Sequence, residues 1–195
     1  DTYNVAIGHI AGSSITTGVQ NTIMGGLAGD ALTTGNENVA VGYAALSSED
    51  AHGQNVAVGH NALASLNAGA NALNTAVGYF AGLNMTTGRF NTSLGSMSMG
   101  TGVTTGDNNT ALGYFAGEDL TSGVENTLVG GLSGRNITSA VNNTALGYAT
   151  LTNNVVGDNN TALGYRALED FVADTDGHGE NTAIGASAML NASTG

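Results

Sequence analysis

Side chains that could do acid–base chemistry occur at three places in this 195-residue chain, where two carboxylates are adjacent. Paired carboxylates can act as general acid and general base in glycoside hydrolysis. The simpler interpretation is that adjacent acids on an exposed turn provide solvating charge, which also opposes edge-to-edge aggregation of a β-rich protein. The three pairs are Glu49–Asp50, Glu118–Asp119 and Glu169–Asp170.

The most concentrated acidic stretch runs over residues 174–180 and could bind a metal ion. Its Asp-x-Asp-Gly opening is similar to the start of a calcium loop, and the carboxylates of Asp174, Asp176 and Glu180 are hard oxygen ligands that suit Ca²⁺. The remainder of an EF-hand loop does not follow in the sequence. We therefore expect no cofactor, with a structural calcium ion at these three residues as the alternative.

The histidines give no sign of a nucleophilic mechanism. His9, His52, His60 and His178 are scattered along the chain, and the serines and aspartates keep no fixed spacing to them. A Ser-His-Asp arrangement is therefore not indicated. We expect solvated turn and surface histidines, no catalytic residues and no enzyme activity.

The composition excludes several classes of protein. The absence of cysteine excludes a disulfide framework and a thiolate metal site. Three arginines and no lysine stand against fifteen acids, giving a net charge of −12, which is a poor match for a phosphate backbone, so we expect no nucleic-acid partner. The sequence has no long apolar run and no signal-peptide pattern, so we expect no membrane insertion by this segment. What remains is a chain of small residues with 31 glycines, which is typical of a repeat protein.

A repeat of about 17 residues fills the chain. Its unit is Asn, then Thr or Val, usually Ala, then an aliphatic residue or Met, then Gly; we count the Asn as position one. The eleven copies begin at Asn4, Asn21, Asn38, Asn55, Asn74, Asn91, Asn109, Asn126, Asn143, Asn160 and Asn181. We therefore interpret residues 1–195 as a single repeat domain.

Three further positions of the repeat are informative. Position five is glycine in every copy: Gly8, Gly25, Gly42, Gly59, Gly78, Gly95, Gly113, Gly130, Gly147, Gly164 and Gly185. Position six is tyrosine in five copies: Tyr43, Tyr79, Tyr114, Tyr148 and Tyr165. Where position nine is Gly, position seven is bulky, and where position nine is Leu or Met, position seven is mostly small or polar. We interpret positions seven and nine as one face of a strand that holds a fixed side-chain volume.

The pattern predicts an all-β fold. Two short alternating segments per unit, each closed by Gly or Asn, predict two strands and two turns, and frequent Gly, Asn and Thr disfavour a helix. The architecture that fits is a parallel β-solenoid or β-roll of eleven coils of about 17 residues, a rod on the order of 50 Å long. The Asn side chains would form a ladder between coils, the position-five glycines a turn, and the position-four aliphatics a continuous row.

Two apolar faces are more than one thin roll can bury. Positions two, four and six form one face and positions seven and nine the other, so we expect one face to pack against further copies of the chain in a homo-oligomer. Terminal repeats normally carry polar caps, and neither end of this sequence shows one. We therefore expect either an excised segment of a larger fibre or coils that stack end to end into a filament.

The motifs NVAIG at 4–8, NVAVG at 38–42 and 55–59, NTALG at 109–113 and NTAIG at 181–185 resemble the head repeats of trimeric autotransporter adhesins. They are also similar to the NTAxG repeats of some phage tail fibres. The resemblance implies a left-handed parallel β-roll, three chains side by side, and an extracellular location on a cell surface or a virion. The unit in those adhesins is shorter, and we expect no stalk or membrane anchor within this segment.

The sequence therefore predicts a structural or adhesive fibre segment, a stiff rod that presents a binding surface to a host-surface glycan or protein receptor. The candidate binding features are the tyrosine row and the insertions at 50–53, 67–73 and 170–180. One alternative is an ice-binding solenoid, because Thr-x-Val and Thr-x-Leu would recur on a flat face of low charge. Another is a polysaccharide-degrading fibre enzyme, which would need clustered carboxylates.

Overall fold

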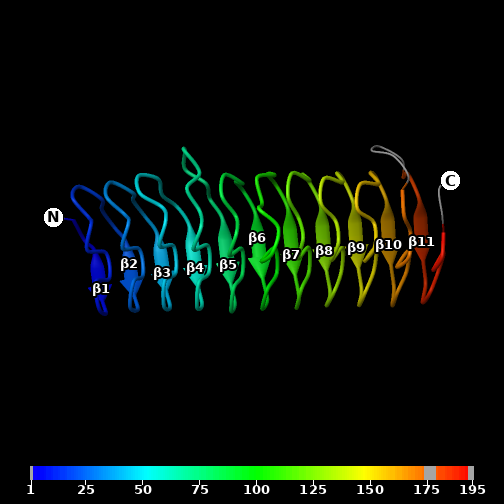
Figure 1. Ribbon diagram of the computed structural model, residues 1–195, viewed down its shortest axis with the longest axis horizontal. Helices are drawn as coiled ribbons and strands as arrows, with labels where there is room; N and C mark the ends of the chain where they lie inside the picture. Colours follow the sequence, from blue (N-terminus) through cyan, green and yellow to red (C-terminus); the bar gives the residue numbers. More distant parts are fainter. Residues whose placement is uncertain (1, 174–178, 193–195) are drawn as a thin grey trace.

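The structure is a computed structural model that describes residues 2–173 and 179–192, in which the chain winds into a rod of successive coils (Figure 1). Each coil contributes one three-residue strand, and the described residues contain no helix. The strands are β1 (Val5–Ile7), β2 (Thr22–Met24), β3 (Val39–Val41), β4 (Val56–Val58), β5 (Thr75–Val77), β6 (Thr92–Leu94), β7 (Thr110–Leu112), β8 (Thr127–Val129), β9 (Thr144–Leu146), β10 (Thr161–Leu163) and β11 (Thr182–Ile184).

All eleven strands form one parallel sheet in chain order. The register pairs equivalent positions of neighbouring repeats, so that Val39 of β3 lies opposite Thr22 of β2 and Val56 of β4. The coils therefore stack one repeat on the next, and side chains of equivalent positions form rows along the rod. The predicted all-β parallel solenoid is confirmed.

The Asn side chains at position one connect each coil to the next. In β2's coil the backbone N–H of Asn21 donates to Oδ1 of Asn4 at 2.8 Å, and Nδ2 of Asn21 donates to the carbonyl of Gly35 at 2.8 Å. The same pattern repeats along the rod, and the ladder asparagines from Asn21 to Asn160 are fully or almost fully buried. The asparagine side chains thus bond to backbone N–H and C=O groups next to each short strand. These groups lie outside the strands and have no partner in the sheet.

Glycine at position five is required by both conformation and space. These eleven glycines have φ between 123° and 141°, which L side chains rarely adopt. A Cβ on Gly42 would also lie 2.3 Å from the carbonyl oxygen of Gly59 in the next coil. The turn after the strand is therefore closed to every other residue.

The predicted second strand of each coil is wrong. Positions seven and nine both have left-handed backbone, as in Ala44 (φ 50°) and Leu46 (φ 54°). Between them the N–H of Ala45 bonds back to the carbonyl of Gly42 at 3.4 Å, which closes a tight turn. A residue in the left-handed region reverses the pleat, so the segment winds through turns instead of extending.

The expected pairing of positions seven and nine on one face is also wrong. Position-nine side chains point into the core, where Leu46 is fully buried, whereas Phe80 at position seven is only half-buried. The compensating partner is position twelve: Leu32 lies opposite Gly29, and a Cβ on Gly29 would lie 2.9 Å from Cδ1 of Leu32. Every coil with Gly at position nine carries Ile, Leu or Met at position twelve, whereas two coils are large at both positions, as in Leu63 with Leu66 and Leu168 with Phe171. Positions nine and twelve therefore fill the core jointly, together with buried position three.

Candidate functional site

The acid pair Glu49–Asp50 does not form an exposed catalytic dyad. Glu49 is fully buried at position twelve, where most coils carry an aliphatic residue. Its Oε1 accepts the backbone N–H of His52 at 3.0 Å and lies 3.1 Å from Nδ1 of the same histidine. Glu49, exposed Asp50 and His52 place potential ligand atoms within 4.8 Å of one another. The Glu49 carboxylate accepts the backbone N–H of His52 and contacts its ring, so its hydrogen-bonding capacity is used within the protein. We therefore interpret these three residues as a structural cluster.

The other two acid pairs lie beside arginines. Glu118 is buried, its Oε2 accepts from Nε of Arg135 at 2.6 Å, and its Oε1 accepts from Oγ1 of Thr101 at 3.0 Å. The pKa of Asp119 is raised above its usual value of 3.8, first by partial burial and then by the Glu118 charge, which outweigh the opposing effect of Arg135. Glu169 pairs with Arg166 in the same way.

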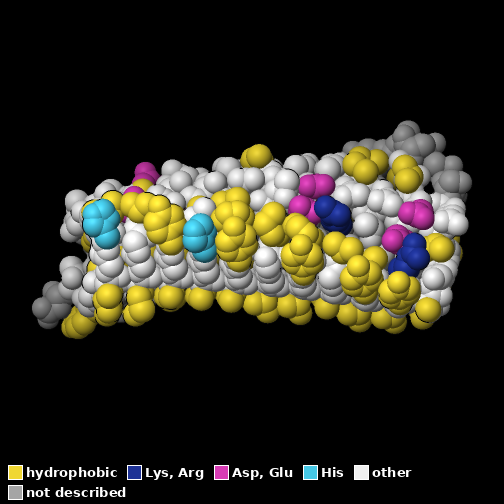
Figure 2. All heavy atoms as spheres, turned by 60° about the horizontal axis from the view of Figure 1, so that its bottom comes forward, with side chains coloured by type: hydrophobic (Ala, Val, Ile, Leu, Met, Phe, Trp, Pro, Cys, Tyr) yellow, Lys and Arg dark blue, Asp and Glu magenta, His cyan; other side chains and the backbone are white. Residues whose placement is uncertain are grey.

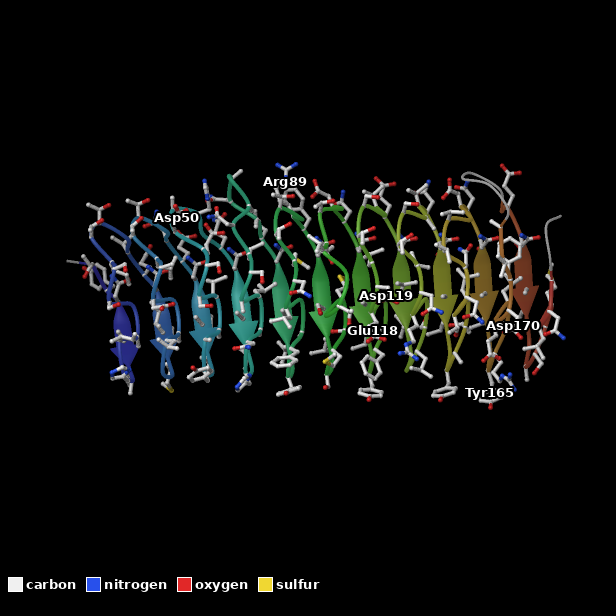
Figure 3. The ribbon with its side chains drawn as sticks, viewed as in Figure 1. Asp50, Arg89, Glu118, Asp119, Tyr165 and Asp170 are labelled. Atoms are coloured by element: carbon white, nitrogen blue, oxygen red, sulfur yellow. The ribbon has the colours of Figure 1, made fainter. Side chains whose placement is uncertain are left out.

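The acid pairs lie too far apart to work together. Figure 3 shows Asp50, Glu118 with Asp119, and Asp170 on separate coils of the rod. Glu118 and Glu169 are three coils apart, about 14 Å at the spacing of β-strands. Two-carboxylate glycosidases need a separation below about 10 Å, so the arrangement offers no support for a hydrolytic site between coils.

The calcium candidate is only partly within the described residues. Asp174 and Asp176 lie outside them, as does His178. Glu180 is exposed, has a φ of 60°, and donates its backbone N–H to the carbonyl of Asp158 at 3.0 Å. The calcium site stays a prediction.

The outer face of the sheet is uncharged and combines a row of Thr and Val with a row of aliphatic residues. In each strand the central residue points into the core, while positions two and four point outward, as in β9, where Ala145 is buried and Leu146 is 46% exposed. Position two is Thr or Val, position four is aliphatic or Met, and no residue of the eleven strands carries a charge. Hydrophobic side chains form a continuous row along one edge of the rod in Figure 2.

Aromatic side chains form a second row at position six, beyond the position-five glycine. His60 lies between Tyr43 and Tyr79, with ring centroids 5.2 and 5.5 Å away. Tyr148 stacks on Tyr165 with centroids 5.8 Å apart. In Figure 2 this row, which includes histidine, is interrupted along its length and has arginine and acidic side chains beside it. The sequence identified the tyrosines as candidates. It did not single out the small residues, Ser96 and Gly131, that separate three of them at position six.

The candidate site is therefore a pair of extended surfaces, the uncharged sheet face and the aromatic row. The described residues enclose no cavity for a small ligand, and they contain no helix that is long and apolar enough to cross a membrane. No family model matches the chain, and neither does any curated protein or solved structure. Functional assignment therefore rests on the geometry of these surfaces and on the motifs quoted above.

Proposed function

We propose that this chain is a structural and adhesive segment of an extracellular fibre, on a cell surface or a virion, in which copies of the rod pack side by side through the outer face of the sheet. The observation that supports this function is the uncharged outer face of all eleven strands, where position two is Thr or Val and position four is a continuous row of aliphatic residues or Met. A contiguous exposed apolar surface of this length is uncommon on a monomer and typical of an interface.

The energetics of such packing are favourable. Full burial of an aliphatic side chain contributes about 1.5–3 kcal/mol, and the face repeats this contribution coil after coil. Because no strand residue is charged, covering the face desolvates no ion. The resemblance to adhesin heads adds the expectation of three chains around a common axis. In that assembly repetition along a stiff rod would also supply avidity for a host-surface glycan or protein.

The oligomeric state of the purified chain tests this proposal. We expect a discrete trimer in sedimentation equilibrium, and Leu112→Lys together with Leu146→Lys should shift the population to monomers. The matched control is Val103→Lys, which changes an exposed apolar residue (55% exposed) that lies outside the strands. A monomeric wild-type chain at micromolar concentration would contradict the proposal.

Ice binding is a second candidate for the same face. Position two is Thr in seven consecutive strands, β5 to β11, and these threonines point outward in register on an uncharged face. Ordered rows of this kind could match a lattice of water molecules, but only if no other chain covers them. Thermal hysteresis by a monomeric sample would support this function, and its absence at millimolar concentration would reject it.

A further inference from the structure

The aromatic row is interrupted at regular places. Along five successive coils, position six is Tyr79, Ser96, Tyr114, Gly131 and Tyr148, so that two small residues alternate with three tyrosines. All three tyrosines are between 52% and 56% exposed. We call this segment the tyrosine track.

Neighbouring tyrosines of the track are two coils apart. This separation is about 9.6 Å at the spacing of parallel strands. Where the aromatic row is uninterrupted, ring centroids lie 5.2 to 5.8 Å apart. Ser96 and Gly131 therefore place no aromatic ring at position six in these two intervals, and the Tyr148 ring lies 3.4 Å from where a Cβ on Gly131 would be.

Side chains next to the track support its rings. Phe80 stacks on Tyr79, and Phe115 packs against Tyr114, each with centroids 4.0 Å apart. Arg135 lies over the Phe115 ring at 5.1 Å and is held there by Glu118. Rings held in place in this way lose little conformational freedom when a ligand packs against them.

The chemistry of the track fits a sugar chain. The C–H faces of a pyranose ring are apolar and pack on aromatic faces, while its hydroxyl groups can bond to the tyrosine hydroxyls and to Ser96. Each interval of two coils is close in length to the disaccharide repeat of an extended β-1,4-linked chain. With a net charge of −12, the protein would repel an acidic polysaccharide.

We propose that the tyrosine track binds an uncharged, β-1,4-linked polysaccharide, with sugar rings entering the intervals over Ser96 and Gly131. This inference rests on the proposed adhesive function and names the class of ligand. It places the ligand beyond the position-five glycines, on a different row from the face through which copies would pack.

Filling the intervals provides the sharpest test. Ser96→Tyr and Gly131→Tyr together give position six the residue that it carries in five other coils, and a Cβ on Gly131 would meet Tyr148 at an ordinary contact distance of 3.4 Å. The filled variant should therefore fold, which its melting temperature verifies. We expect cellohexaose and chitohexaose to bind the wild-type chain in calorimetric titration, and the filled variant to bind at least tenfold more weakly.

Two single variants complete the test. Tyr114→Ala removes the ring shared by both intervals and should weaken binding at least tenfold, whereas Tyr165→Ala lies outside them and should leave the affinity within twofold. The inference is overturned if the wild-type chain binds neither oligosaccharide, if the filled variant binds equally well or better, or if heparin binds as tightly as the neutral sugars.

Sedimentation of the same samples separates this inference from the proposed function. None of these variants alters positions two and four. A wild-type trimer that binds no oligosaccharide would contradict the inference alone, whereas a monomer that binds would contradict the proposed assembly and leave the track in place.

Discussion

At the scale of single residues, the asparagine ladder explains why one polar residue type occupies position one in all eleven coils and is buried in nine of them. Asn126 is fully buried; its Nδ2 donates to Oδ1 of Asn109 at 3.0 Å and to the carbonyl of Ala140 at 2.8 Å, and its Oδ1 accepts from the backbone N–H of Asn143 at 3.1 Å. Only a side-chain amide both donates and accepts in this geometry.

Asn126→Ala should therefore destabilise the rod strongly. The substitution leaves the Asn143 N–H and the Ala140 carbonyl buried without these partners, and each unsatisfied group costs about 1–3 kcal/mol. We expect a loss of about 2–5 kcal/mol in urea unfolding monitored by circular dichroism. Exposed Asn67, which lies outside the ladder and has no left-handed backbone, is the control, because Asn67→Ala should change stability by less than about 0.5 kcal/mol. Equal effects of the two substitutions would show that the ladder contributes nothing special.

The carboxylate of Asp119 should make stability depend on pH in an unusual direction. Its pKa is raised in the folded state, chiefly by burial and by the Glu118 charge, so the fold favours the protonated form. Ionisation therefore lowers stability as pH rises from the unfolded value of 3.8 through the higher folded value. Asp119→Asn should raise the melting temperature at pH 7, by an amount worth less than about 1 kcal/mol because the group is partly exposed.

Thermal melts of Asp119→Asn across pH 3 to 7 check this prediction. The advantage of the variant should shrink as pH falls, because Asp119 of the wild-type chain then becomes protonated as well. A variant that is less stable than wild type at pH 7 would mean that Asp119 contributes to the ion pair of Arg135 more than it suffers from burial and from Glu118.

The sequence predicted most of the residues that build the rod and missed the burial of two acids, Glu49 and Glu118. The ladder asparagines and the position-five glycines are invariant across the repeats, so their roles follow from the pattern and from the properties of the two residues. Glu49 was expected in an exposed turn, because its neighbour Asp50 is also acidic. Aligning position twelve would have placed Glu49 in a row of aliphatic residues and indicated its burial.

At the scale of one coil, the sequence predicted the strand but not the turn that follows it. Positions two to four alternate outward and inward, as expected for a strand with one buried face. Positions six to nine also alternate in size, which resembles the pattern of a second strand. The sign of a turn was the glycine at position nine in five repeats, since the left-handed backbone there is easiest for glycine.

The side chains at positions nine and twelve should be energetically coupled, and a double-mutant cycle in one coil can measure this coupling. Gly29→Leu introduces a side chain that position nine carries in other coils, but it collides with Leu32, whose Cδ1 would lie 2.9 Å from the new Cβ. Leu32→Ala alone should cost about 2–5 kcal/mol through the cavity that it leaves. The double variant should be more stable than the sum of the two losses predicts, by about 1 kcal/mol or more.

Chemical denaturation of the two single variants and the double variant provides the complete cycle. The same cycle with Gly29→Leu and Phe80→Ala serves as a comparison. Phe80 is only half-buried at position seven and lies three coils away from Gly29. If the two cycles give the same coupling, the compensation between positions nine and twelve is not a packing effect.

At the scale of the whole molecule, the residue type at each repeat position determines a surface that runs along the rod, because equivalent positions of successive coils are stacked. Among the described residues, acids and arginines lie outside the strands, so the sheet face stays uncharged over all eleven strands. The solenoid and its register could be predicted because every coil repeats the same pattern. The number of chains in the proposed assembly could not be predicted, because the residues of one chain specify an uncharged outer face without specifying how many copies share it.

The separation of charge from the sheet face predicts how assembly responds to salt. Copies that each carry a net charge of −12 repel one another, whereas the apolar contact between their faces does not depend on ion pairs. At an ionic strength of 0.1 M charges are screened beyond about 10 Å, so added salt should weaken the repulsion and leave the contact intact. We therefore expect tighter association in sedimentation equilibrium when sodium chloride is raised from about 20 mM to about 200 mM.

An interface built from the Arg135–Glu118 and Arg166–Glu169 pairs would respond in the opposite direction, because salt screens attraction as well. Dissociation of the assembly by added salt would thus place the contact on the charged turns and remove the sheet face from it.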